Sequence, residues 1–130
     1  MKKGFTLIEL LAVIVILAII SLIATPVVLD IINNAKENTK LRSAEKYLDA
    51  VEQAILRKNV ETIGGSIPSE CQIITNGNVD CNGKIFTVEV DGEIPDSGII
   101  KYENGKIINI NLVYDTDIIV MNESGVLEYQ

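Results

Sequence analysis

The chain of 130 residues contains no histidine, so no imidazole is available as a general base, a metal ligand or a pH switch. Without histidine, no serine or cysteine nucleophile can be paired with an imidazole base. Neither a Gly-x-Ser-x-Gly turn nor a glycine-rich phosphate loop occurs, and internal repeats are also missing. These absences argue against an enzyme.

Basic residues are scarce as well, with 11 Lys and Arg against 18 Asp and Glu and a net charge of −7. Nonspecific affinity for nucleic acids comes largely from Lys and Arg on phosphates. An acidic chain of this kind is therefore not expected to have a nucleic acid as a partner.

The longest apolar segment lies at the N-terminus, where residues 10–20 include no polar side chain. As a helix, residues 5–25 would be about 31 Å long, which matches the hydrocarbon thickness of one bilayer. Lys2 and Lys3 precede this segment and predict that its N-terminal end stays in the cytoplasm. By length, the chain is expected to be one domain plus this anchor.

Two simple interpretations of the segment fit poorly. A secretory signal peptide needs a small-residue cleavage site after the apolar run, whereas this run continues into Thr25-Pro26-Val27-Val28. A plain membrane anchor leaves Glu9 unexplained, because a carboxylate inside an apolar segment costs about 2.5–3.5 kcal/mol to insert.

Residues 2–11 read KKGFTLIELL, and this stretch resembles the class III leader and cleavage site of type IV pilins and related pseudopilins. The resemblance covers residues 2–26, and the remainder is similar to that family only in architecture. It implies that a prepilin peptidase cuts between Gly4 and Phe5 and methylates the new amine. Residues 1–4 would then be the leader, and Glu9 would match the glutamate that these proteins use in assembly.

A physical argument for Glu9 stands beside the resemblance. A carboxylate near the end of a membrane helix is tolerable if a cation meets it, and the freed amine of Phe5 would be cationic at neutral pH. That amine lies one helical turn away in the same chain, or it could come from a neighbouring helix shifted along the axis. Because an unpaired buried charge is costly, such a pair would select one stagger between copies. The alternative is that Glu9 only reaches the membrane interface.

Residues 5–58 are expected to form one long helix, with 5–25 as its membrane or filament-core part. Pro26 removes one backbone hydrogen bond and predicts a kink rather than an end, because apolar residues continue beyond it. Residues 36–58 form an amphipathic pattern. Its apolar stripe consists of Leu41, Ala44, Leu48, Val51 and Ile55, widened by Tyr47 and Ala54.

The two cysteines, Cys71 and Cys81, fall in the part of the chain expected to be exported, where such a pair usually forms a disulfide. A metal site would need more ligands than two thiols, and no histidine or third cysteine is present. The closed loop would add about 2–3 kcal/mol to stability in the chain-entropy model.

Residues 59–83 are rich in turn signals and are expected to be a loop between helix and sheet that contains this disulfide. Residues 84–130 predict an antiparallel sheet, which makes the fold class α+β, with the long helix packed on a C-terminal sheet. The expected strands are 84–91, 99–103, 106–114, 118–122 and 126–129.

The pair Asn104-Gly105 between two apolar runs is a strong hairpin signal. A two-residue loop would place Ile100 beside Asn109, whereas a three-residue loop would pair Ile100 with Ile108. Since the buried face sets the register, the three-residue loop is the prediction.

Two weak sites remain in the second half. Asp115 and Asp117, with Asp91 or Asp96, could hold calcium, but two aspartates in one turn are common and no cofactor is expected. Asn122-Glu123-Ser124 fits a glycosylation sequon, a pattern that is frequent by chance.

Together these features predict a structural subunit of a type IV pilus or a related filament, for adhesion or motility. One alternative is a pseudopilin of a secretion or DNA-uptake pseudopilus, and another is a solitary membrane-anchored binding domain. The implied partners are other copies of the chain, the prepilin peptidase, the membrane and the inner-membrane assembly machinery. The chain would lie in the cytoplasmic membrane first and in an extracellular or periplasmic filament afterwards.

Overall fold

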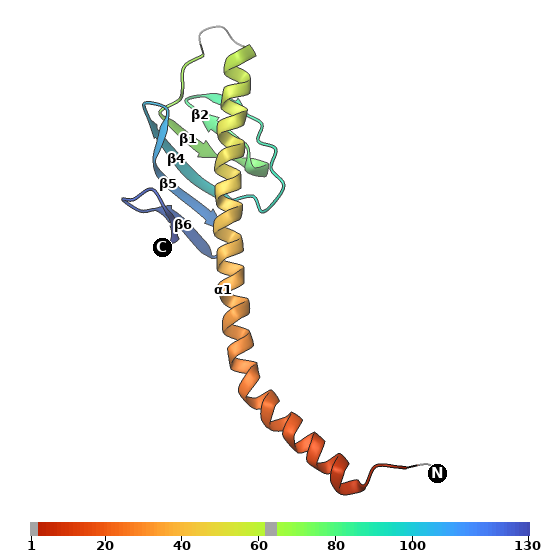
Figure 1. The fold of residues 1–130 in the computed structure, drawn as a ribbon. Helices are drawn as coiled ribbons and strands as arrows, with labels where there is room; N and C mark the ends of the chain where they lie inside the picture. Colours follow the sequence, from red (N-terminus) through yellow and green to blue (C-terminus); the bar gives the residue numbers. More distant parts are fainter. Residues whose placement is uncertain (1–2, 62–64) are drawn as a thin grey trace. The chain divides into compact units, whose positions relative to one another are not determined.

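The computed structural model describes residues 3–61 and 65–130, and it consists of one long helix followed by seven strands (Figure 1). The chain divides into two compact units, Met1–Asn38 and Thr39–Gln130, and helix α1 contributes to both. The elements are α1 (Leu7–Glu61), β1 (Glu70–Ile73), the 3₁₀ turn η1 (Thr75–Gly77), β2 (Val79–Cys81), β3 (Lys84–Phe86), β4 (Ser97–Glu103), β5 (Lys106–Tyr114), β6 (Asp117–Met121) and β7 (Leu127–Tyr129).

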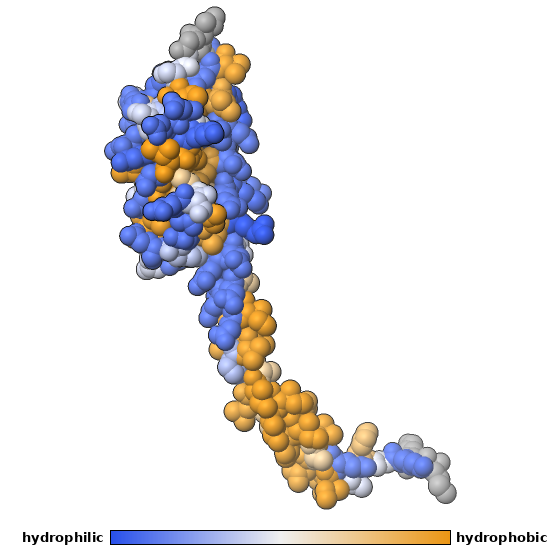
Figure 2. Space-filling view, turned by 60° about the vertical axis from the view of Figure 1, so that its left-hand side comes forward, coloured by the Kyte–Doolittle hydropathy of each residue, from blue (hydrophilic) through white to orange (hydrophobic). Residues whose placement is uncertain are grey.

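The first unit contains the N-terminal part of α1, which is apolar on every side up to Leu29 except at Glu9, Ser21 and Thr25. Every residue from Lys3 to Asn38 is exposed, and Figure 2 shows hydrophobic colour along much of this part of the helix. Polar side chains dominate residues 30–38. Helix α1 continues through Pro26 without interruption. The continuous helix is therefore confirmed, while the kink at Pro26 stays a prediction.

The second unit packs the C-terminal part of α1 on one face of the sheet. All neighbouring strands are antiparallel, in the order β3-β2-β1-β4-β5-β6-β7, so the predicted α+β fold class is confirmed. The predicted helical stripe is buried at Ala44, Leu48, Val51 and Ile55, and Leu41 is partly buried against the same core.

Two cross-strand rows of apolar side chains form the sheet side of this core. Cys81, Cys71, Ile100 and Ile110 lie directly opposite one another across β2, β1, β4 and β5. The second row runs from the β3 edge towards β7 and contains Phe86, Val79, Ile73, Leu112 and Ile119.

Gly98 occupies the place in the second row between Ile73 and Leu112. A Cβ atom there would collide with the carbonyl oxygen of Asn111, and the φ of 151° also disfavours any other residue. Glycine at this position therefore lets β4 pass closely beside β5.

The sheet begins earlier than predicted, because β1 and β2 lie inside the segment 59–83 that the sequence analysis treats as a loop. Residues 62–64 of that segment lie outside the described residues. The turn signals were recognised, but they connect strands of three or four residues, too short to give a visible alternation. Asn76 and Asn82 have positive φ values of 62° and 55°, as hairpin turns of the Asn-Gly type require.

The predicted strand 84–91 is shorter in the structure, since β3 ends at Phe86. The following residues keep the predicted alternation, with Val88 buried and Val90 partly buried. The backbone N–H of Val88 donates to Oδ1 of Asn78 at 3.1 Å, so a side chain replaces the strand partner at this point. The helix, by contrast, is longer than predicted and ends at Glu61 rather than at residue 58.

The three-residue loop predicted for the β4–β5 hairpin is wrong. Glu103 pairs with Lys106, and the loop is the two residues Asn104 and Gly105, both with positive φ. A β-bulge shifts the register between Lys101 and Tyr102, so that Ile100 faces Ile110 and Ile108 is left exposed. The buried face does set the register, as argued from the sequence, but a bulge achieves it instead of a longer loop.

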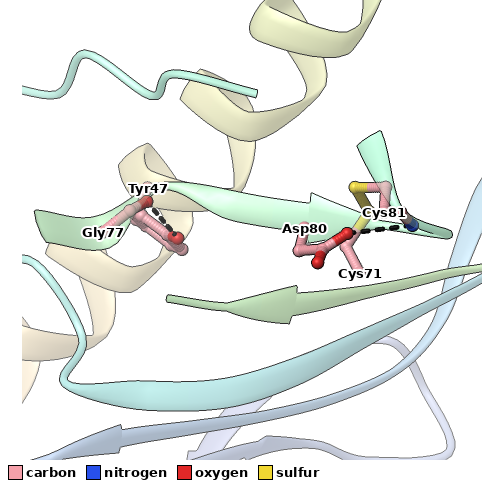
Figure 3. Close-up of a disulfide and its surroundings, with 6 residues drawn as sticks. Tyr47, Cys71, Gly77, Asp80 and Cys81 are labelled. Atoms are coloured by element: carbon pink, nitrogen blue, oxygen red, sulfur yellow. Dashed lines mark hydrogen bonds between the residues drawn. A yellow bond between two sulfur atoms is a disulfide. The ribbon is translucent and has the colours of Figure 1, made fainter. Parts of the chain in front are cut away.

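The disulfide joins Cys71 on β1 to Cys81 on β2, as Figure 3 shows, and confirms the predicted pairing. The two cysteines are directly opposite each other, and both side chains belong to the hydrophobic core. The bridge therefore crosslinks two strands inside the core, rather than tying off a surface loop.

Replacing both cysteines, Cys71→Ala with Cys81→Ala, is expected to lower the free energy of unfolding by about 2–3 kcal/mol. Denaturant unfolding of the detergent-solubilised full chain measures this loss. Amide hydrogen exchange should accelerate in β2 and β3, while β5 and β6 change little. Reduction of the unmodified protein is the control, and an unchanged unfolding midpoint in both samples would contradict the expectation.

Three tyrosines are buried in the core with different hydrogen bonding. The hydroxyl of Tyr47 donates to the carbonyl oxygen of Gly77 at 2.7 Å, which pins helix α1 to the β1–β2 turn (Figure 3). Within the described chain, the hydroxyls of Tyr102 and Tyr114 have no hydrogen-bond partner. Burial raises the pKa of all three hydroxyls, that of Tyr102 to about 12.

Tyr47→Phe should therefore cost about 1 kcal/mol of stability, whereas the matched change Tyr102→Phe should be neutral or stabilising. Because the folded pKa values exceed the unfolded value of about 10, the contribution of these tyrosines to stability should be constant below pH 10 and fall above it. Chemical denaturation at several pH values measures both effects. A Tyr102→Phe loss as large as that of Tyr47→Phe would count against this assignment.

Candidate processing and assembly site

The predicted processing segment lies just before the helix. Lys3, Gly4 and Phe5 form no helix or strand, and all three are exposed, while Lys2 lies outside the described residues. Within the described chain, nothing lies within 4 Å of a Cβ placed on Gly4, and Gly4 is not one of the glycines with positive φ. The fold itself therefore does not require glycine at this position, so any such requirement comes from a molecule that binds here.

Thr6 and Glu9 together begin helix α1. The backbone N–H of Thr6 donates to Oε2 of Glu9 at 2.8 Å, and the backbone N–H of Glu9 donates to Oγ1 of Thr6 at 3.3 Å. This reciprocal pair is a capping box, in which two side chains satisfy N–H groups that the first helical turn leaves unpaired. The helix accordingly begins at Leu7.

The sequence analysis missed this role of Thr6, although the signal is present as Thr-x-x-Glu before an apolar run. The capping box gives Glu9 a partner within its own chain. A carboxylate has two oxygens and several acceptor positions, so capping leaves it able to accept from a further donor. The proposed pairing of Glu9 with the Phe5 amine remains compatible with the cap, and the structure does not test it.

The other polar side chains of the apolar segment also bond within the helix. The hydroxyl of Ser21 donates to the carbonyl oxygen of Leu17 at 2.8 Å, and the hydroxyl of Thr25 donates to that of Ser21 at 2.6 Å. The carbonyl of Leu22 cannot accept the usual helical hydrogen bond from residue 26, because Pro26 has no backbone N–H group. A helix with its polar groups satisfied internally is the form that an apolar environment accepts.

Comparison with known families adds one finding at this site. Residues 1–25 match the family model of the prokaryotic N-terminal methylation motif. The chain carries a prepilin-type methylation motif. Neither the curated proteins nor the solved structures gave a match to the chain.

The methylation motif agrees with the resemblance to type IV pilins and pseudopilins drawn from residues 2–26. It supports a pilin-like protein that is processed at its N-terminus, and the pilin-like proteins that carry this motif are structural. The motif also implies processing by a peptidase and assembly into filaments. The helix α1 that follows it is long and apolar enough to cross a membrane, which agrees with anchoring before assembly.

Two of the aspartates considered for calcium, Asp117 and Asp96, have other partners. Asp117 forms an ion pair with Lys40, and the hydrogen bond to Asp117 raises the pKa of Lys40. Oδ2 of Asp96 accepts from the backbone N–H of Asp115 at 2.7 Å. In the part of the chain that the structure describes, no three acidic or cysteine side chains gather to hold a metal. Calcium at Asp115 and Asp117 would therefore have to displace Lys40.

The side chain of Asn122, the acceptor in the glycosylation sequon, holds the β6–β7 turn together. Its Oδ1 accepts from the backbone N–H groups of Ser124 and Val126, each at 3.0 Å, and its amide donates to Glu128 at 3.1 Å. A glycan on this amide would disturb the contact with Glu128. The residue therefore has a structural role that the sequon pattern did not indicate.

Thr6→Val removes only the bond to the Glu9 N–H, and it should weaken the helix start by about 1 kcal/mol. Glu9→Gln should preserve both bonds of the cap, because glutamine serves in a capping box, whereas Glu9→Ala should remove only the bond from the Thr6 N–H. Amide exchange at Thr6 and Glu9 in detergent micelles measures these effects. Equal protection in all three variants would show that the capping box contributes nothing.

Proposed function

We propose that this protein is the structural subunit of a type IV pilus or a closely related filament. The observation that carries the proposal is the exposed helix of residues 7–29, which is apolar on all sides except at Glu9, Ser21 and Thr25. It comes directly after an accessible Gly4-Phe5 junction in a methylation motif. A prepilin peptidase would cut that junction from the cytoplasmic side. The second unit would then coat the filament, while the apolar helix forms its core.

The apolar helix needs cover in both states of the protein. Large apolar residues such as Leu22 and Ile23 are 78% and 68% exposed in the single chain, which water disfavours. Lipid would cover them before assembly, and helices from other copies would cover them afterwards. Since both environments are apolar, moving between them changes the solvation free energy little.

Glu9 would decide how neighbouring helices are staggered. It is the single ionisable side chain between Phe5 and Asp30, so the amine of a neighbouring Phe5 has one carboxylate to meet in this region. An unpaired charge in an apolar core is costly, and one axial shift would satisfy both groups. Capping by Thr6 fixes where the helix begins and thereby fixes the height of the carboxylate relative to the amine.

The runner-up function is a pseudopilin in a secretion or DNA-uptake machine, which shares the same leader and helix. Shearing cells and examining the detached material separates the two functions. A pilus subunit would be the main component of long external fibres, whereas a pseudopilin would remain with the cell envelope. A solitary anchored domain would keep its leader and form no fibres.

Intact mass should place the N-terminus of sheared material at Phe5 with one added methyl group, and retention of Met1 there would overturn the proposal.

Glu9→Ala should enter the membrane at least as well as the unmodified chain, because a charge is removed. Its fibre yield should drop sharply, as should that of the matched control Glu9→Gln, which keeps the cap but not the charge. Normal fibre yield from Glu9→Gln would mean that the charge plays no part in assembly.

A further inference from the structure

Helix α1 carries an acidic stripe on its surface in the second unit. Glu45, Asp49 and Glu52 are spaced at i, i+4 and i+7, and all three are exposed. Since a helix turns about 100° per residue, this spacing brings them onto one side of α1. We refer to Glu45, Asp49 and Glu52 as the acidic flank.

A basic stripe adjoins it on the same helix. Arg42, Lys46 and Arg57 are spaced at i, i+4 and i+15, and they are also exposed. The helical period places all three next to the acidic flank, without interleaving. We refer to Arg42, Lys46 and Arg57 as the basic flank.

The two flanks share the side of α1 that faces away from the core, since Ala44, Leu48, Val51 and Ile55 point to the sheet. Figure 2 shows this part of the helix as a hydrophilic surface. Among the described side chains, no member of either flank forms an ion pair within 4.0 Å. Even Arg42 with Glu45, three residues apart, stays unpaired.

We propose that the acidic flank of one copy packs against the basic flank of a second copy, so that α1 helices lie side by side in the filament. This inference rests on the proposed function, because it requires the chain to assemble with itself. The two flanks are complementary in charge, because each copy presents an acidic stripe and a basic stripe on one exposed face of α1. The pairing would add direction and specificity to the apolar contacts of the first unit.

We place the two flanks in a heterologous contact, because the proposed filament is open. When the acidic flank of one copy engages its neighbour, the basic flank of the first copy stays available for the next. Head-to-tail contacts of this kind continue indefinitely unless a rotation closes a ring. A self-complementary contact would instead stop at a dimer.

A competing arrangement sets the basic flank against the sheet of another copy. From residue 65 onward the chain contains three lysines and eleven acidic residues, so the sheet also attracts a basic surface. That arrangement leaves the acidic flank without a role. The test must therefore change each flank separately.

Two full-length variants reverse one flank each, in cells that assemble the unmodified chain into fibres. Arg42→Glu with Lys46→Glu gives both flanks a net negative charge, although Arg57 stays basic, and Glu45→Lys with Asp49→Lys gives both a net positive charge, although Glu52 stays acidic. Each variant alone should lower the yield of sheared fibres about tenfold, since two attractive pairs become repulsive at every contact. Co-expression of the two should restore the yield, because copies of opposite sign can alternate.

Lys101→Glu is the matched control, because it reverses an exposed charge on β4 away from both flanks, and it should keep the normal yield. Rescue by co-expression also shows that each variant folds. Normal yield from either flank variant, or failure of co-expression to restore fibres, would overturn the inference while leaving the proposed function standing. Absence of fibres from the unmodified chain would instead overturn the proposed function and this inference with it.

Discussion

The structure depends on one constraint, namely that helix α1 is apolar on nearly all sides from Leu7 to Leu29 and that these residues are exposed in the single chain. The apolar stripe that packs on the sheet lies further along the helix. The residues before Asp30 therefore require lipid or other protein chains around them. Lipid would cover this helix before assembly, and helices of other copies would cover the same residues in the filament.

The polar groups of this segment are arranged to suit such surroundings. Thr6 and Glu9 satisfy each other's backbone N–H groups, and Ser21 and Thr25 bond to carbonyls one turn earlier. Only the carbonyl opposite Pro26 is left without its usual donor. Glu9 is thus both a helix cap and a charge, and these two roles are separable because glutamine retains the first and not the second.

The candidate site could be predicted from the sequence where it depends on residues that are close together along the chain. The Gly4-Phe5 junction, the apolar run and Glu9 lie within one short stretch, and the methylation motif matched there agrees with them. The capping box was equally local and was missed, because Glu9 was interpreted only through charge. The hydrogen bond of Asn122 to Glu128 and the ion pair of Asp117 with Lys40 could not be predicted. The positions of these partners depend on the fold.

The α+β class, the helical stripe, the disulfide partners and the positions of the Asn-Gly turns could be predicted from the sequence, but not the length of the β4–β5 loop. Hydrophobic period and Asn-Gly pairs act over a few residues, and two cysteines allow only one pairing. Tertiary contacts are the reason that β1 and β2 join the sheet and that a bulge at Ile108 sets the β4–β5 register. Strands of three or four residues carry too little pattern to be recognised alone, and they form because neighbours supply hydrogen bonds and a buried face. The bulge has the same origin: a two-residue loop fixes the turn, and burial of Ile100 beside Ile110 then requires one extra residue.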